Sequence, residues 1–381
     1  MKAIARVLIL GLSLSFVAVL ASDGGEDFEK GKLAYQEKNY GEAFHYFTNA
    51  AETGHADAQF WLGSMYQSDD YGLQADLAKM YNWFERAAQN GNARAAFEVA
   101  SRNTGSWIWP DDDYSETIPL LERAAELGHG EAMIQLTAIY ARDHEHHADK
   151  EKEVYWTQRA AEAGQKEGQF QLSQMYFKGY GVERDENAAA SWLQAAARNG
   201  HDGAQYEYGM TLFRGLLGQE ANKELALEWI KLACRNENSA AFGFLSMAFL
   251  TGDGVAKDTE VAYNLLVESV RLGDDDAAFK LAEVFAGGGF GEQDIETALT
   301  WLHIAEKRDE HPGVAAARAN IKREIGYDSY LLKVAEGRAD ACVRSGFERD
   351  WEAWECRTGI PSEEERQATE ALYDLVSGSD E

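Results

Sequence analysis

The sequence predicts an all-α protein, an α/α superhelical solenoid of about eight helix-turn-helix repeats with a helical C-terminal cap. A large residue, usually aromatic, recurs every 36 or 37 residues along most of the chain. A glycine follows this residue eight positions later in most repeats, as expected where a helix ends. Only 4 prolines occur in 381 residues, which permits long helical stretches.

The recurring large residue sets the register of the repeats. It is found at Tyr46, Trp83, Leu120, Trp156, Trp192, Trp229, Leu265 and Trp301. The position eight residues further on holds Gly54, Gly91, Gly128, Gly164, Gly200, Glu237, Gly273 and Asp309. Chance does not keep such a phase through so many repeats, so the period indicates a stacked architecture.

Each repeat is expected to begin with a helix whose apolar residues lie four positions apart. In the clearest repeat, Leu172 and Tyr176 form such a pair and lie on one helix face. Gly179 and Gly181 then end this helix, because glycine readily adopts the positive φ of a tight turn. Asp185 follows the turn and is predicted to cap the second helix.

The second helix is predicted from a stripe of small and aromatic residues. Ala189, Trp192 and Ala196 are spaced by three and four positions, which places them on one face. Alanine pairs allow close approach of neighbouring backbones, and the aromatic residue is expected to fill the remaining core. The pairs are Ala50-Ala51, Ala87-Ala88, Ala124-Ala125, Ala160-Ala161 and Ala196-Ala197. Cys234 takes the second alanine position of its repeat and is predicted to be a buried packing residue.

The assembled pattern AxxxLGxxYxxGxGVxxDxxxAxxWxxxAAxxG resembles the Sel1-like repeat, a relative of the tetratricopeptide repeat, over roughly residues 28–325. The resemblance implies a stack of helical hairpins, curved into a right-handed superhelix, in which neighbours bury each other's apolar stripes. It also implies an adaptor that assembles complexes. Many family members are exported from bacteria or work in secretory compartments. The first repeat departs from the pattern with a short turn at residues 37–39, and the third and fourth repeats lack the glycine turn.

The N-terminal segment is predicted to be a signal peptide. Lys2 and Arg6 precede an apolar run at residues 7–21, which is short for a membrane span and is followed by polar residues. We expect cleavage after Ala21 and a periplasmic or secreted protein, with no stable membrane insertion after cleavage. An uncleaved membrane anchor is the alternative interpretation of the same run.

The rest of the chain is expected to comprise a repeat solenoid, a cap and a tail. The predicted boundaries are 22–325 for the solenoid, 326–376 for the helical cap and 377–381 for a disordered tail. Cys342 and Cys356 lie 14 positions apart in the cap and could form a disulfide in an oxidising compartment. Such a bridge would stabilise the fold by about 3 kcal/mol.

The charge of the chain restricts its partners. The formal net charge is -29, with 65 acidic against 36 basic residues. This charge repels phosphate backbones and anionic lipids, so nucleic acid is not expected as a partner. A protein or peptide partner is predicted, and a basic one would suit the charge best.

Candidate partner-binding residues lie on the first helices, which line the concave groove of helical solenoids. The residues directly before the core leucine position are Trp61, Gln135, Gln171, Glu207 and Phe244, with Gln174 and Met247 further along. This mixture of aromatic, amide, acidic and thioether groups suits a peptide or helix ligand. The alternative is that each side chain is simply solvated.

Two insertions interrupt the repeats and offer further candidate sites. Trp107 and Trp109 lie in an acidic turn, where they either fold back over a neighbouring repeat or anchor a partner. His144, His146 and His147 lie among acidic residues and could bind a divalent metal. A single solvated loop is the simpler interpretation of the histidine run.

No catalytic motif is present, so we expect a scaffold without a cofactor and not an enzyme. The sequence lacks a nucleophile elbow, a phosphate loop, a zinc-binding His-Glu-x-x-His and a Cys-x-x-Cys. The resemblance supplies one enzymatic alternative, because cysteine-rich members are reported to bind or hydrolyse β-lactams. Those members carry a cysteine pair in each repeat, which this chain lacks. A secreted effector acting on host proteins is the third hypothesis.

Overall fold

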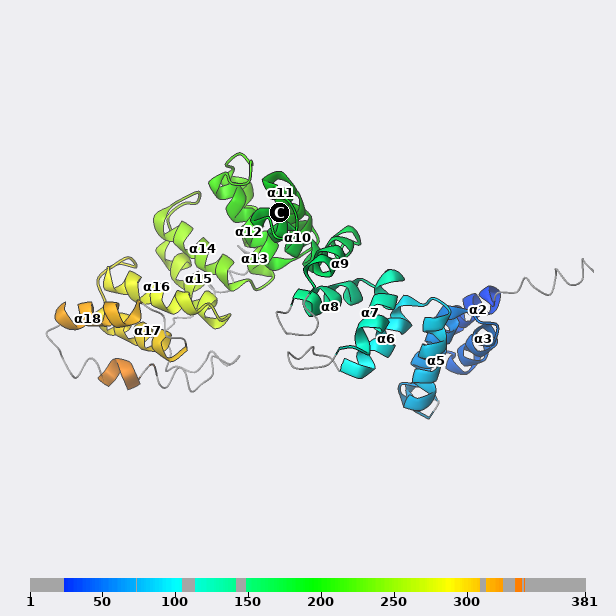
Figure 1. Cartoon of the computed structure of the whole chain (residues 1–381). Helices are drawn as coiled ribbons and strands as arrows, with labels where there is room; N and C mark the ends of the chain where they lie inside the picture. The colour runs from blue at the N-terminus through cyan, green and yellow to red at the C-terminus, as the bar shows by residue number, and fades with distance from the viewer. Residues whose placement is uncertain are drawn as a thin grey trace, which may run out of the picture. The chain divides into compact units, whose positions relative to one another are not determined.

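The computed structural model describes residues 24–72, 74–104, 114–141, 149–308, 313–324, 333–337 and 339. Within these ranges every regular element is a helix, which confirms the predicted all-α class (Figure 1). The chain forms two compact lobes. The N-terminal lobe comprises Met1–Leu172 and Gly179–Glu183, and the C-terminal lobe comprises Ser173–Lys178 and Arg184–Glu381.

The N-terminal lobe is a series of helical hairpins, each with a first and a second helix. The hairpins are α2 (Gly25–Gln36) with α3 (Tyr40–Glu52), α4 (Ala56–Met65) with α5 (Leu77–Gln89), α6 (Ala93–Thr104) with α7 (Thr117–Glu126), and α8 (Gly130–Ala141) with α9 (Lys150–Glu162). A short 3-10 helix, η1 (Asp69–Tyr71), lies between α4 and α5. The first part of α10 (Lys166–Lys178) completes the lobe.

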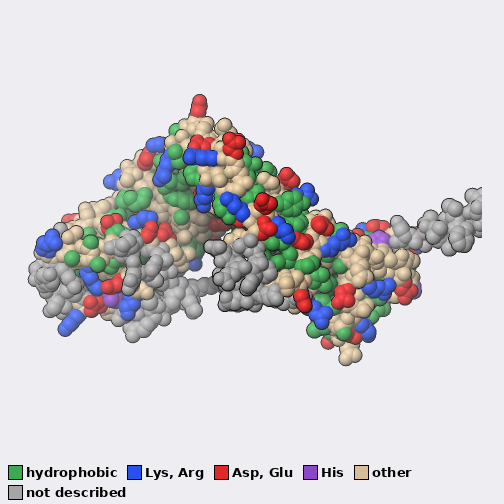
Figure 2. Space-filling view, viewed as in Figure 1, with side chains coloured by type: hydrophobic (Ala, Val, Ile, Leu, Met, Phe, Trp, Pro, Cys, Tyr) green, Lys and Arg blue, Asp and Glu red, His purple; other side chains and the backbone are tan. Residues whose placement is uncertain are grey.

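The C-terminal lobe continues the same alternation. It contains α11 (Glu186–Arg198), α12 (Asp202–Arg214), α13 (Lys223–Arg235), α14 (Ser239–Thr251), α15 (Thr259–Arg271), α16 (Asp275–Ala286), α17 (Ile295–Arg308) and α18 (Val314–Glu324). Helix α18 packs against α16 and α17 and so covers part of the last hairpin. Acidic, basic and apolar side chains are mixed over the visible face of the described residues (Figure 2).

The predicted turns and caps of the second helices are present. Gly179 and Gly181 both have φ near 69°, and the Asp185 carboxylate accepts hydrogen bonds from the Asn187 and Ala188 amides, both at 2.9 Å. The glycines that close the repeats also have positive φ. The non-glycine residue Glu237 takes the same left-handed conformation, with φ 59°.

In most repeats the residue after the closing position caps the next first helix, which the sequence reasoning missed. His55, His129 and His201 accept a backbone N–H through Nδ1, at 3.3, 3.3 and 3.1 Å. Asn92 and Asn238 use a side-chain oxygen in the same way. The signal was visible, because a residue that can accept a hydrogen bond follows the glycine in repeat after repeat.

The position of the tryptophans differs in part from the prediction. Trp156 and Trp301 are buried, with 5% and 3% of their surface exposed, as expected of core residues. Trp83, Trp192 and Trp229 are half-buried, and Trp83 packs against the core cluster of the first repeats, so these three lie at the edge of the core and not at its centre. The centre of the buried stripe lies one residue later. Its members are Phe47, Phe84, Leu121, Thr157, Leu193, Ile230, Leu266 and Leu302.

The alanine positions bring neighbouring helices into close contact, as predicted. The described pairs are buried, except that Ala88 is half-buried. Cys234 is buried with 2% of its surface exposed, and burial raises the pKa of its thiol to about 12. An unreactive packing role follows for this cysteine.

Several predicted features lie outside the described residues. They are the signal segment 1–21, Trp107, Trp109, His144, His146, His147, Cys342, Cys356, most of the cap at 326–376 and the tail at 377–381. Within the cap, residues 333–337 are helical. None of the helices that the structure describes is long and apolar enough to cross a membrane.

Candidate functional site

Apart from Trp107 and Trp109, which lie outside the described residues, the predicted partner-binding residues lie on first helices, five of them at one repeat position and Gln174 and Met247 three residues further on. We call Trp61, Gln135 and Gln171 the N-terminal strip, and Gln174, Glu207, Phe244 and Met247 the C-terminal strip. Every member is half-buried except Glu207, which is exposed. The residue directly after Trp61, Gln135, Gln171, Glu207 and Phe244 is buried in every case. These buried residues are Leu62, Leu136, Leu172, Tyr208 and Leu245. The side chains of each strip are therefore anchored at the edge of the core.

Trp61 is held by other aromatic rings. Its indole lies 4.9 Å from the Tyr35 ring in an edge contact and 5.7 Å from the Phe47 ring in a stacked one. The Tyr35 hydroxyl donates to the Tyr71 hydroxyl over 3.1 Å. This hydrogen bond, with burial, raises the pKa of Tyr35 to about 12. The cluster keeps Trp61 in one orientation and leaves part of the indole accessible.

Gln135 and Gln171 carry the clearest unsatisfied chemistry of the N-terminal strip. The side-chain oxygen Oε1 of each is buried and has no hydrogen-bond partner. The Nε2 of Gln171 donates to Glu167 Oε1 over 3.1 Å, which fixes the amide with its oxygen pointing away from that carboxylate. Buried amide oxygens without a donor are uncommon in native proteins.

The C-terminal strip combines one amide and one acid with two apolar side chains. Partial burial of the Glu207 carboxyl raises its pKa, an effect that His201 and Lys178 partly offset, although the residue as a whole is exposed. The Phe244 ring meets the Phe213 ring edge-on at 5.0 Å. Met247 is half-buried in α14.

One further strip residue was missed by the sequence reasoning. Met210 is half-buried in α12, at the position that Met247 holds one repeat later. The spacing of 37 residues between them was available as a signal. Two methionines at matching positions add flexible apolar side chains to the C-terminal strip.

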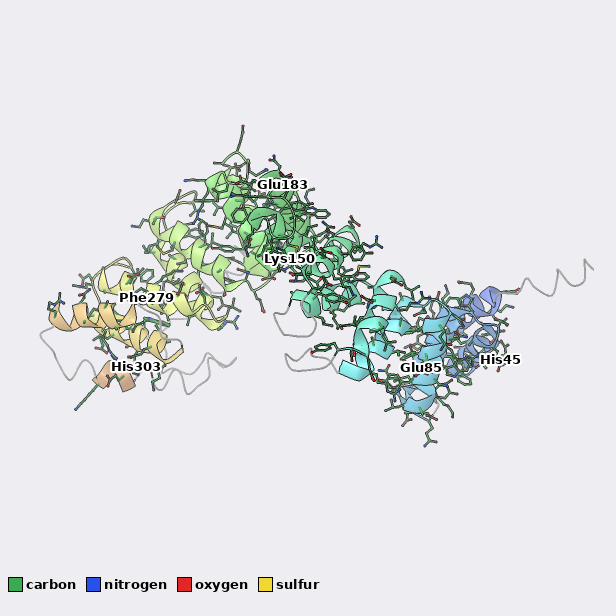
Figure 3. All side chains as sticks on the ribbon, in the orientation of Figure 1. His45, Glu85, Lys150, Glu183, Phe279 and His303 are labelled. Atoms are coloured by element: carbon green, nitrogen blue, oxygen red, sulfur yellow. The ribbon has the colours of Figure 1, made fainter. Side chains whose placement is uncertain are left out.

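The described residues contain no group of three or more His, Cys, Asp or Glu side chains able to hold a metal ion. The candidate histidines at 144, 146 and 147 are outside those residues, so the metal site stays a prediction. The side-chain view shows His45 on the N-terminal lobe and His303 on the C-terminal lobe (Figure 3). His303 lies 3.4 Å from the Glu306 carboxylate and contacts Arg318.

A family model described as Sel1 repeat matches the chain in eight segments. These cover residues 28–55, 56–92, 93–129, 148–165, 166–201, 203–238, 243–274 and 275–309. Seven of the matched segments correspond to observed hairpins, whereas the segment 148–165 covers α9 without its partner helix α8. No curated protein matches the sequence.

Several solved structures are similar to this chain. A Sel1 repeat protein from Oxalobacter formigenes is 25% identical, with a TM-score of 0.53, and the match covers 84% of this chain and 92% of that one. The protective antigen c5321 of uropathogenic Escherichia coli is 20% identical, with 89% and 88% covered and a TM-score of 0.43. The immunity protein Pa5087 from Pseudomonas aeruginosa is 21% identical, with 58% and 83% covered and a TM-score of 0.36.

Proposed function

Because the chain belongs to the Sel1 repeat family, we propose that it is an exported scaffold that binds a protein or peptide through its first-helix strips. Sel1 repeat proteins generally act as protein-interaction scaffolds and are typically non-enzymatic. The proposal adds a location, the cell envelope or its exterior, and a binding surface, the N-terminal and C-terminal strips.

The observation that carries the proposal is the half-buried state of side chains at one repeated position. Trp61, Gln135, Gln171 and Phe244 are packed along one side and accessible on the other. Side chains that are already ordered lose little conformational entropy when a partner binds, so such a row is suited to binding. Tryptophan is also among the residues that contribute most to protein interfaces.

Affinity capture from an envelope extract tests the strips. We expect the purified protein to retain a partner, and the variants Trp61→Ala, Gln135→Ala, Gln171→Ala, Glu207→Lys and Phe244→Ala to retain less of it. Glu85 is exposed on second helix α5, so Glu85→Lys serves as the matched surface control. Circular dichroism would verify that each variant is folded. Equal partner recovery from all five strip variants would reject the proposed surface.

Export is tested separately, by fractionation and by mass spectrometry of the mature N-terminus. Cleavage after Ala21 predicts a periplasmic or secreted protein that begins at Ser22. A membrane-bound protein that retains residues 1–21 would instead support the uncleaved anchor. Material in the external medium would favour a secreted protein over a resident of the envelope.

A further inference from the structure

Four aromatic side chains of the first two repeats lie together in the N-terminal lobe. We call them the aromatic face, and they are Tyr35 of α2, Tyr40 of α3, Trp61 of α4 and Tyr71 of η1. The Tyr35 ring lies at the centre, with centroid distances of 5.4, 4.9 and 5.7 Å to the rings of Tyr40, Trp61 and Tyr71. All four side chains pack against the core of the first repeats and are half-buried, so each keeps an accessible part.

The rings of the aromatic face are not covered by a cation. Other rings of the same lobe are covered, since the Arg86 guanidinium lies 4.2 Å from the Trp83 ring and the Lys79 ammonium lies 5.3 Å from the Tyr66 ring. Within the described ranges, no basic side chain makes such a contact with a member of the aromatic face. The accessible parts of these rings are therefore available to a ligand.

The aromatic face also presents hydrogen-bond donors that are not used within the described part of the chain. There, the Trp61 Nε1–H and the Tyr40 hydroxyl have no hydrogen-bond partner, and neither atom is buried. The Tyr71 hydroxyl accepts the hydrogen bond from Tyr35, so its own hydrogen stays available. The indole nitrogen of Trp301 provides the contrast, because it is buried and no ligand could reach it.

We propose that the aromatic face binds a proline-rich peptide in the polyproline II conformation. This inference rests on the proposed scaffold function and names the chemical class of the ligand at Trp61. A polyproline II chain has no internal hydrogen bonds, so its carbonyl oxygens can accept from the three donors while its rings pack on aromatic side chains. Proline has no N–H group, so the peptide brings acceptors alone to a surface rich in donors. Such a chain is also ordered before it binds, which lowers the entropic cost of association.

Two carboxylates beside the aromatic face favour a basic residue next to the prolines. Asp69 and Asp70 are exposed and directly precede Tyr71 in η1. Asp69 accepts a hydrogen bond from the Ala75 amide over 2.6 Å, and Asp70 accepts one from the Ser68 hydroxyl over 2.8 Å. These bonds hold both carboxylates in place and leave each with further lone pairs. The ligand is therefore expected to carry a lysine or arginine at the end of its proline run.

Fluorescence anisotropy with labelled peptides tests the ligand class. The probe is a fluorescein-labelled peptide of one arginine followed by about nine prolines, which spans roughly 28 Å as polyproline II. In one comparison peptide alternating glycine and serine replace the prolines, and in another glutamate replaces the arginine. We expect the glycine-serine peptide to bind at least about tenfold more weakly than the probe, because it keeps the charge and loses the rigid rings. The glutamate peptide should also bind more weakly, because Asp69 and Asp70 repel it.

Removal of single donors tests the residues of the aromatic face. Tyr40→Phe and Tyr71→Phe each keep the ring and the net charge and remove one hydroxyl. Each lost hydrogen bond should weaken probe binding roughly two- to tenfold, so the double variant should bind about fivefold more weakly or worse. Trp61→Phe removes the Nε1 donor and should have an effect like that of one tyrosine variant. Tyr155→Phe is the matched control, because Tyr155 is an exposed tyrosine of α9, and it should bind like the unmodified protein.

A second control separates ligand binding from the internal hydrogen bond of the aromatic face. Tyr35→Phe breaks the hydrogen bond between Tyr35 and Tyr71, as Tyr71→Phe does, but it leaves all three donors in place. It should therefore bind the probe like the unmodified protein. Circular dichroism and thermal unfolding verify that each variant is folded.

Three results would overturn the inference. They are no binding of the probe, equal affinity of the double tyrosine variant for it, and equal binding of the glycine-serine peptide, since any basic peptide would then suffice. If the tyrosine hydroxyls do not affect probe binding but the strip variants lose their envelope partner, the scaffold proposal stands and this ligand class fails. If the hydroxyls are needed for probe binding but every strip variant still captures its partner, the strips fail as the partner surface and the proline-binding face stands.

Discussion

Replacing Gly168 with alanine tests how closely the helices of the N-terminal lobe approach each other. A Cβ atom at this position of α10 would lie 2.6 Å from Ala160 Cβ, 2.9 Å from Ala161 N and 3.0 Å from Ala160 C. The last two are backbone atoms of α9, so no side-chain rotation relieves the overlap. The α9 and α10 backbones must move apart, and such overpacking costs about 1–3 kcal/mol.

The expected net effect is a lower free energy of unfolding. Alanine gains roughly 0.5–1 kcal/mol over glycine inside a helix, so Gly168→Ala should destabilise the protein by up to about 2.5 kcal/mol. Urea unfolding followed by circular dichroism measures this change. Gly41 is the matched control, because it is also helical and a Cβ there would meet nothing within 4 Å. Gly41→Ala should be neutral or slightly stabilising.

A second substitution sharpens this test. Adding Ala160→Gly to Gly168→Ala removes the shortest contact and leaves the two backbone contacts, so recovery should be partial. The reasoning is refuted if Gly168→Ala is as stable as Gly41→Ala. Full recovery in the double variant would show that the backbone contacts cost nothing.

Three further predictions address caps, pH and thiol reactivity. Asp185→Ala removes the cap of α11 and should cost about 1 kcal/mol in urea unfolding, whereas exposed Glu183→Ala should not, and equal stabilities would contradict the capping role. Burial, with a smaller contribution from Arg94, lowers the pKa of His129 from 6.5, so the unfolded chain binds a proton more readily than the folded one. The stability that this ring contributes is therefore complete above pH 6.5 and lost as pH falls through the lowered pKa. His129→Asn keeps a cap and should flatten the pH dependence of Tm below pH 7, unlike His45→Asn at an exposed position, and an unchanged profile would argue against this assignment. In a Cys342→Ser/Cys356→Ser background, the buried Cys234 thiol should react with a disulfide reagent only after unfolding, and rapid labelling of the native protein would disprove its inert role.

The fold could be predicted from the sequence because the turn and cap residues of each repeat are consistent with stacked helical hairpins. Glycines at positive φ and an aspartate cap appear where their chemistry requires them, as at Gly179 and Asp185. The register of the strips also followed from the period, so Trp61 and Phe244 lie on first helices as expected. Such agreement between local preference and global packing is what makes repeat folds predictable.

The depth of a side chain was less predictable than its register. Trp192 lies in the recurring aromatic position, but Leu193, about 100° further around the helix, occupies the centre of the buried stripe. The apolar face of a helix is wide enough to include two adjacent positions. The repeat period alone therefore cannot predict which of two adjacent residues is the more deeply buried. The unsatisfied oxygens of Gln135 and Gln171 were equally invisible, because hydrogen-bond satisfaction depends on surrounding atoms that the sequence does not place.

The junctions between repeats share one hydrogen-bond geometry, whatever residue occupies them. The amide of the residue after the closing position donates to a carbonyl five residues back, at His55, Asn92, His129, Gln165, His201, Asn238 and Asp274. Duplication or excision of a whole 36-residue module would thus join ends that already match, with no new loop to optimise. A gene of this kind can lengthen or shorten its contact surface in single steps during evolution, and ligand size can follow repeat number without redesign of the fold.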